Sequence, residues 1–252
     1  MRLTWLCSVY FLLPSAFGLT VILDPGHGGY DKGAVYGSAQ EAKIVLLLGE
    51  KIKQLLEQDK INVFLTRSQD QFISLKQRVQ ISKKQSGDLF VSLHANASSD
   101  RRAYGLEFFL NPNRRSNHFA PLTRTARDIT TTETDRNKDD IVELSKAKDI
   151  AKILKDIKHN IQSQKSLKLT RSLQQDLPGN IKQAPFYVLT QTQMPSVLIE
   201  VGFLSHPQDN KKLMNDEYRN DLALKIADSI KRYTRAIYPP SNLLDENTPT
   251  PR

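Results

Sequence analysis

The 252-residue sequence predicts a single α/β domain with a mixed, mostly parallel sheet flanked by helices. Two observations predict this fold class. Short apolar runs typical of buried strands alternate with longer segments whose apolar residues repeat at helical spacing. The chain is also long enough for one full hydrophobic core, and it shows no internal repeat. With 39% hydrophobic and 25% charged residues, the composition excludes collagen-like, coiled-coil and wholly disordered chains.

Strands and helices alternate in the first half of the chain. Residues 19–23 (LTVIL) form an apolar run that ends in the glycine-rich segment DPGHGG, as expected of a buried strand followed by a tight turn. Apolar residues at helical spacing between Ile44 and Leu56 predict a helix over 40–57. By the same criteria we expect a helix at 73–85 and strands at 61–67, 88–96 and 104–110.

The second half of the predicted domain, which spans 19–238, is less regular. Few apolar residues occur over 111–140, which predicts an irregular insertion. A helix is expected over 141–163 because its apolar residues share one face; they are Ile150, Ile153, Leu154, Ile157 and Ile161. We further expect strands at 185–190 (PFYVLT) and 196–201 (SVLIEV), a final helix at 216–238, and a disordered Pro-rich tail over 239–252.

Residues 1–18 have the features of a cleaved signal peptide. Arg2 supplies a positive start, an apolar stretch follows, and Ala16-Phe17-Gly18 offers a small-residue cleavage site. The alternative is an N-terminal membrane anchor, but the apolar run is short for ~30 Å of hydrocarbon. Cleavage would remove the only cysteine, and a cysteine-free chain suits an oxidising compartment. We therefore expect an exported, periplasmic protein with no stable membrane anchor.

The chain is basic, with 36 Lys and Arg against 27 Asp and Glu and a formal charge of +9. Such a charge favours either nucleic acid or an anionic cell envelope as partner. The basic residues are spread over several predicted helices and form no stripe interleaved with aromatic residues. Together with export, this favours envelope polymers over nucleic acid, and no nucleic-acid partner is expected.

Four polar residues stand where chemistry is expected. His27 follows the first strand, while His94 and Glu200 close two others, and the carboxyl ends of parallel strands meet at one edge of a sheet. Taken singly, His27 suits a structural turn, His94 a core position, and the fourth residue, Glu41, the start of a helix, where a carboxylate complements the dipole. Glu200 lies in an apolar run, where a carboxylate is hard to explain without a partner.

Two histidines and one carboxylate are a common three-ligand set for a hydrolytic zinc ion. A further carboxylate that is not a ligand can accept a proton from water and deliver it to a leaving amine. A zinc site built from cysteines is excluded, since the chain has a single Cys. The residues alone leave both the zinc site and the separate structural roles open.

Several motifs, in order, resemble those of the amidase-3 family of zinc-dependent N-acetylmuramoyl-L-alanine amidases, which includes cell-division amidases. They cover nearly all of 20–235, and include VILDPGHGGYDKGA, LTRSQDQFISLKQRVQISKKQSGDLFVSLHANAS, GLEFFL, QAPFYVLTQTQMPSVLIEVGFLSHPQD and MNDEYRNDLALKIADSIKRY. The resemblance implies that His27, Glu41 and His94 bind zinc and that Glu200 is the catalytic carboxylate. It also implies the same mixed, mostly parallel sheet.

The activity implied is hydrolysis of the amide between N-acetylmuramic acid and L-alanine, in wall remodelling and daughter-cell separation. The substrate is left open among polymeric peptidoglycan, released muropeptides and lipid-linked precursors. The insertion at 111–140 is shorter than in division amidases that carry a self-blocking helix with a carboxylate. Glu133 and Glu143 are the nearby glutamates, so autoinhibition, and with it a protein activator, stays a hypothesis.

Two rival functions remain. Ser145 and Lys148 fit the S-x-x-K motif of serine-type carboxypeptidases, although no K-T-G motif accompanies it and a solvated basic helix face explains both residues. The other rival is a non-catalytic peptidoglycan-binding regulator with the same fold. The presence of Glu200 argues against it, because a protein that only binds has no need of that carboxylate.

Overall fold

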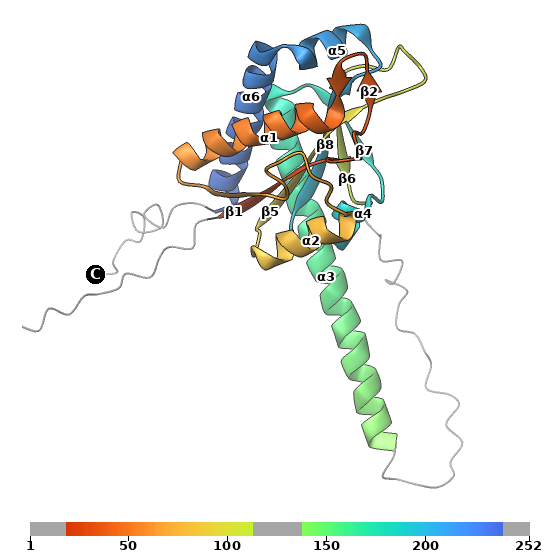
Figure 1. Cartoon of the computed structure of the whole chain (residues 1–252). Coiled ribbons are helices and arrows are strands. Elements are labelled where there is room, and N and C mark those ends of the chain that lie inside the picture. The colour runs from red at the N-terminus through yellow and green to blue at the C-terminus, as the bar shows by residue number, and fades with distance from the viewer. Residues whose placement is uncertain (1–18, 113–137, 239–252) are drawn as a thin grey trace, which may run out of the picture.

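A six-stranded sheet forms the centre of the computed structural model, which describes residues 19–112 and 138–238 (Figure 1). Its strands are β1 (Thr20–Pro25), β4 (Asn62–Leu65), β5 (Leu89–Asn96), β6 (Leu106–Leu110), β7 (Gly179–Gln183) and β8 (Ser196–Phe203). The spatial order is β4-β1-β5-β8-β6-β7. All neighbours pair in parallel except β6 and β8, which are antiparallel. The predicted mixed, mostly parallel sheet is therefore confirmed.

Helices cover both faces of this sheet. On one face lie α1 (Glu41–Gln58), α6 (Asp216–Ile237) and the C-terminal part of α3 (Lys138–Asp176), with α5 (Pro207–Met214) packed beside α6 (Figure 1). The smaller α2 (Leu75–Lys84) and α4 (Tyr187–Gln191) contribute to a second apolar cluster on the opposite face. Burial from both sides explains why the central strands read as continuous apolar runs rather than as alternating patterns.

Register places the functional residues at one edge. Leu23 of β1 pairs with Val91 of β5, and His94 farther along β5 pairs with Glu200 of β8. Because β1, β5 and β8 run parallel, the turns and side chains at their carboxyl ends converge, as the sequence predicts.

The helix predicted over 141–163 is part of the much longer α3. Leu169 and Leu173, in its C-terminal part, are fully buried in the core. The apolar residues that identified the helix are instead 49–59% exposed; they are Ile150, Ile153, Leu154, Ile157 and Ile161. Figure 1 shows this part of α3 projecting away from the sheet. Within the described ranges, no helix is both long and apolar enough to cross a bilayer.

The prediction of a strand at 185–190 is wrong, because Tyr187–Gln191 form α4. Leu189 and Thr190 donate backbone hydrogen bonds to the carbonyl of Phe186, which closes a helical turn. The strand that pairs with β6 at the edge of the sheet is β7. It is polar, so the apolar pattern of the sequence does not reveal it.

Other elements were not predicted: the hairpin of β2 (Val35–Tyr36) and β3 (Ala39–Gln40), and α5. The α3 helix also begins at Lys138, inside the predicted insertion. The rest of that insertion up to residue 137, the signal peptide predicted over 1–18 and the tail predicted over 239–252 lie outside the described residues.

Candidate metal centre

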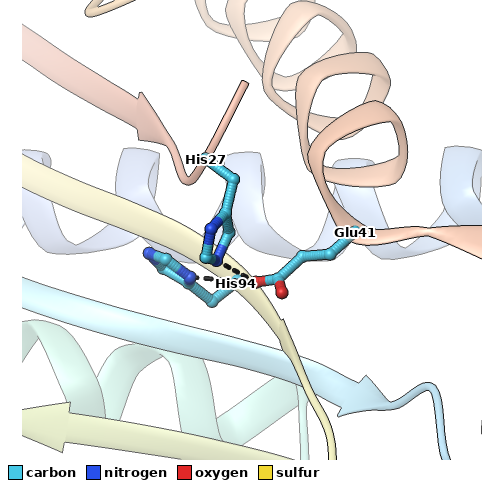
Figure 2. Close-up of side chains that lie close together, drawn as sticks. All are labelled: His27, Glu41 and His94. Carbon is cyan, nitrogen blue, oxygen red and sulfur yellow. Dashed lines mark hydrogen bonds and ion pairs between the residues drawn. The ribbon is translucent and has the colours of Figure 1, made fainter. Parts of the chain in front are cut away.

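His27, Glu41 and His94 meet at the carboxyl edge of the sheet (Figure 2). Their candidate ligand atoms all lie within 4.8 Å of one another. Oε1 of Glu41 is 3.1 Å from Nε2 of His27 and 2.9 Å from Nδ1 of His94. The residues come from the turn after β1, the first position of α1 and β5, so three segments distant in sequence build one cluster.

The Glu41 carboxylate is buried and held from several sides. The backbone N–H of Ala95 donates to its Oε1 at 3.0 Å, and that of Ala34 donates to its Oε2 at 2.8 Å. Burial by itself raises the pKa of this carboxyl, but the hydrogen bonds and charges of His27 and His94 outweigh burial and lower it. Glu41 is therefore an anion that lies between two imidazoles. A carboxylate must be deprotonated to bind a metal ion, so this state suits a ligand.

His27 is oriented by Asp31, a residue that the sequence reasoning missed. Nδ1 of His27 lies 2.9 Å from both carboxylate oxygens of Asp31, which leaves Nε2 facing Glu41. Burial lowers the pKa of His27, yet Glu41 and Asp31 together raise it above its usual value. A carboxylate on the outer nitrogen of a metal-binding histidine fixes the ring and raises its basicity as a ligand. The only signal in the sequence is an acid four residues after the histidine.

The backbone of the DPGHGG turn brings the two imidazoles together. His27 has a positive φ of 57°, a left-handed conformation that a side chain adopts at a cost and that often occurs at functional sites. A Cβ on Gly26 would come within 2.3 Å of the His94 ring, and one on Gly33 within 2.4 Å of Oε2 of Glu41. Both glycines are required because the candidate ligands approach the backbone so closely.

Two buried arginines donate hydrogen bonds to the backbone carbonyls of this turn, and neither was predicted from the sequence. Arg67 donates to the carbonyls of Pro25 and Gly26 at 2.9 and 2.7 Å. Arg78 donates to the carbonyls of Pro25 and His27, both at 2.7 Å, and pairs with the buried Asp24 at 2.8 Å. A guanidinium group satisfies several carbonyls at once, so the two arginines hold the strained turn in one conformation.

Glu200 lies beside the cluster on the next strand. It pairs in register with His94 of β5 on one side and with Glu107 of β6 on the other, so all three side chains leave the sheet on the same face. Oε2 of Glu200 is buried and accepts no hydrogen bond from the described residues. Burial raises the pKa of Glu200 to about 7; His94 opposes this increase, while Glu41 and Glu107 add to it.

The donor set fits zinc. Two imidazoles and one carboxylate are its usual protein ligands at hydrolytic sites, where a fourth position stays open for water. A buried carboxylate with an unpaired oxygen and a pKa near neutrality, one strand away from the ligands, is suited to move protons at that position. The structure thus brings His27, Glu41 and His94 into one cluster and places Glu200 on the strand beside it, opposite His94.

The other candidate residues are not brought to this cluster by anything the structure describes. Ser145, Lys148 and Glu143 belong to the first turns of α3, where only the backbone is described. Glu133 lies outside the described residues.

The chain is similar to known proteins over most of its length. The family model described as "N-acetylmuramoyl-L-alanine amidase" (Amidase_3) matches residues 21–232. The chain is 32% identical to the N-acetylmuramoyl-L-alanine amidase AmiC of Neisseria meningitidis, over 84% of this chain and 52% of that protein. It is 31% identical to the N-acetylmuramoyl-L-alanine amidase AmiA of Escherichia coli, over 84% of this chain and 75% of that protein.

Solved structures share the fold. The CwlD amidase of Clostridioides difficile, solved in complex with the GerS lipoprotein, is 25% identical to this chain, with a TM-score of 0.64. The match covers 87% of this chain and all of that chain. The chain described here spans about half the length of the Neisseria relative, so the similarity is to part of that protein.

Proposed function

The chain belongs to the Amidase_3 family of N-acetylmuramoyl-L-alanine amidases, and from that membership we propose that it is a zinc-dependent hydrolase. Its substrate is the amide bond between N-acetylmuramic acid and L-alanine in peptidoglycan. The observation that carries the proposal is the cluster of His27, Glu41 and His94 with the buried carboxylate of Glu200 on the neighbouring strand.

His27, Glu41 and His94 are the residues that would hold the metal. Zinc supplies Lewis acidity, which polarises a carbonyl group and makes water a nucleophile at neutral pH. The chain contributes the anionic charge of Glu41, the ring orientation that Asp31 imposes on His27, and a turn held rigid by Arg67. A preorganised site of this kind loses little free energy to rearrangement when substrate binds.

Glu200 moves the protons. Its carboxylate accepts a proton from the attacking water and then delivers it to the nitrogen of L-alanine, which leaves as an amine. A pKa of about 7 supports this role, because a group that titrates near the working pH both accepts and releases protons readily. In a protein that only binds peptidoglycan, a buried carboxylate without a hydrogen-bond partner would cost stability and serve no purpose.

Export to the periplasm and action on wall polymer during division form the wider proposal. The signal-peptide features of residues 1–18 support export, and membership of the amidase family supports action on the cell wall. N-terminal sequencing of the protein recovered from the periplasm tests the first part. A new terminus near Gly18 is expected, whereas an intact Met1 would favour a membrane anchor.

A protein activator is a further partner that we propose. The apolar residues of α3, among them Ile153 and Ile157, are covered by none of the described residues and are flanked by the exposed Lys152 and Lys155. They suit a partner with an apolar groove and an acidic rim, and the CwlD amidase was solved with a lipoprotein bound. Full activity of the purified chain without any added protein would contradict the need for an activator.

Metal dependence tests the central proposal. Purified muropeptides are incubated with the chain, and the free L-alanyl peptides are quantified. Release is expected to stop when zinc is chelated and to return when zinc is added back. Release that persists in the metal-free protein would contradict a zinc hydrolase.

A further inference from the structure

An exposed aromatic pair lies next to the candidate metal centre. The rings of Tyr30 and Phe72 stack with their centroids 4.3 Å apart and an interplanar angle of 26°. Tyr30 is 78% exposed and Phe72 is 40% exposed. Neither belongs to the hydrophobic clusters that the described residues form, so the pair is not needed to fill the core. The described residues thus leave most of the Tyr30 side chain accessible to a ligand.

The turn that carries Tyr30 also carries His27. Gly28 and Asp31 exchange two backbone hydrogen bonds, at 2.7 and 3.2 Å, which places Tyr30 at the tip of a tight turn. Tyr30 stands three positions after His27, so their Cα atoms lie within roughly 11 Å of each other. Asp31, the next residue, binds the His27 ring. The aromatic face and the metal centre are thus two parts of one short loop.

This loop is fixed to the loop that carries Phe72. The N–H of Gly29 donates to Asp70 at 2.8 Å, and Lys32 binds the same carboxylate at 3.1 Å. A Cβ on Gly29 would come within 2.6 Å of the backbone nitrogen of Phe72, so the two backbones are in direct contact. The aromatic pair is therefore held in place before any ligand arrives, which lowers the entropic cost of binding.

We propose that Tyr30, supported by Phe72, is a sugar-binding platform that stacks on an N-acetylhexosamine ring of the glycan strand. The C–H groups on one face of a pyranose ring are weakly positive and pack on the negative face of an aromatic ring. The inference rests on the proposed function, in which the carbonyl at the metal centre belongs to the lactyl group of a muramic acid. Only an ether oxygen and one carbon separate that carbonyl from the sugar ring. A sugar is therefore bound to lie within reach of this loop.

A rival occupant of the same platform is the stem peptide, whose aliphatic side chains also pack on aromatic rings. The glycan is favoured because the platform is a flat, paired aromatic surface rather than an enclosed apolar pocket. The platform makes this chain select substrates that retain their sugar, rather than free peptides.

The experiment is an NMR titration of the zinc-loaded protein, with zinc in excess throughout. One arm uses peptide-free glycan made of alternating N-acetylglucosamine and N-acetylmuramic acid, and the other uses the free stem tetrapeptide. Wild type is compared with Tyr30→Ala, with Tyr30→Phe, which keeps the aromatic face, and with Tyr238→Ala. The last is a matched control, since Tyr238 is 42% exposed at the end of α6.

We expect Tyr30→Ala to weaken glycan binding about three- to tenfold, the usual range for losing one aromatic contact. Tyr30→Phe and Tyr238→Ala should bind like wild type, and tetrapeptide binding should not change. The proposal is overturned if Tyr30→Ala binds glycan as tightly as wild type, if only tetrapeptide binding weakens, or if wild type binds no glycan. Amide hydrolysis is a separate readout, so a wild type that binds glycan through Tyr30 but cuts no muropeptide would refute the amidase proposal alone.

Discussion

Glu200 of β8 and His94 of β5 are register partners on neighbouring parallel strands, and their side chains leave the same face of the sheet. The pairing connects a candidate metal ligand to the one buried carboxylate oxygen that accepts no hydrogen bond among the described residues. A shift of the register by one residue would turn Glu200 toward the opposite face, into the core beneath α1. The strand pairing therefore places the candidate ligand His94 and the proposed proton carrier Glu200 on the same face of the sheet.

The buried carboxyl of Glu200 should make the metal-free protein less stable as pH rises. Its pKa is raised from 4.5 to about 7 in the folded chain, so the folded state retains a proton that the unfolded state loses between these values. The free energy of unfolding therefore falls as pH rises from about 4.5 to 7 and changes little above that range. Glu200→Gln, which stays neutral, should be more stable than wild type at pH 8 by up to about 3 kcal/mol.

Urea denaturation at pH 5 and pH 8 measures this difference. The exposed Glu217 provides a matched control, because Glu217→Gln should show the same pH dependence as wild type. A stability difference between Glu200→Gln and wild type that is equal at the two pH values would contradict the raised pKa.

Asp31→Asn should weaken zinc binding. The amide retains the size of the side chain but loses the negative charge that orients His27 and raises its basicity. Loss of such an outer partner typically lowers metal affinity about 10–100-fold. Competition with a chelator of known affinity measures the change. Asp100→Asn, at an exposed residue that binds only its neighbours, should keep wild-type affinity, and equal affinity of both variants would refute the role of Asp31.

Gly26→Ala should abolish tight zinc binding while the chain still folds. The new methyl group would overlap the ring of His94, so this candidate ligand must move away from Glu41. We expect affinity to fall by more than about 100-fold, beyond the effect of losing an outer partner. Gly37→Ala is the control. Its φ of 60° should cost about 1–2 kcal/mol of stability, but a Cβ there has no atom of the described residues within 4 Å, so zinc affinity should not change.

Arg78→Met should destabilise the fold strongly. It leaves the buried Asp24 carboxylate and the carbonyls of Pro25 and His27 without their shared donor. Breaking a buried ion pair of this kind usually costs about 3–5 kcal/mol. Arg102→Met removes an arginine that pairs with Asp100 at a similar distance, 3.0 Å, but at the exposed surface, and no measurable change is expected there. Equal urea midpoints for the two variants would contradict the stabilising role of Arg78.

Much of the fold could be predicted because its signals are local. The apolar runs before His27 and around Glu200 and His94 mark buried parallel strands, and the spacing within 40–57 marks α1. The run PFYVLT was misread because a short apolar segment suits either a strand or a helix, and only its neighbours decide. The polar strand β7 carries no apolar signal at all, since it lies at the edge of the sheet.

The three candidate ligands were predictable from the sequence, but the residues that support them were not. Histidines and acids at strand ends are conspicuous in a sequence, whereas Arg67 and Arg78 look like ordinary surface charges until the fold buries them. On α3 the sequence pattern fails in the opposite way, because it predicts burial for side chains that are exposed. Its isoleucines, such as Ile157, indicate a packed face by their spacing, yet nothing among the described residues covers them.

The most direct test of the central claim is mass spectrometry of muropeptides after incubation with the zinc-loaded chain and with Glu200→Gln. Wild type is predicted to release free L-alanyl peptides and to leave the N-acetylmuramic acid intact. Glu200→Gln should bind zinc with unchanged affinity and release none. Equal release by both proteins, or loss of a terminal D-alanine instead of the whole peptide, would contradict the assignment of this site.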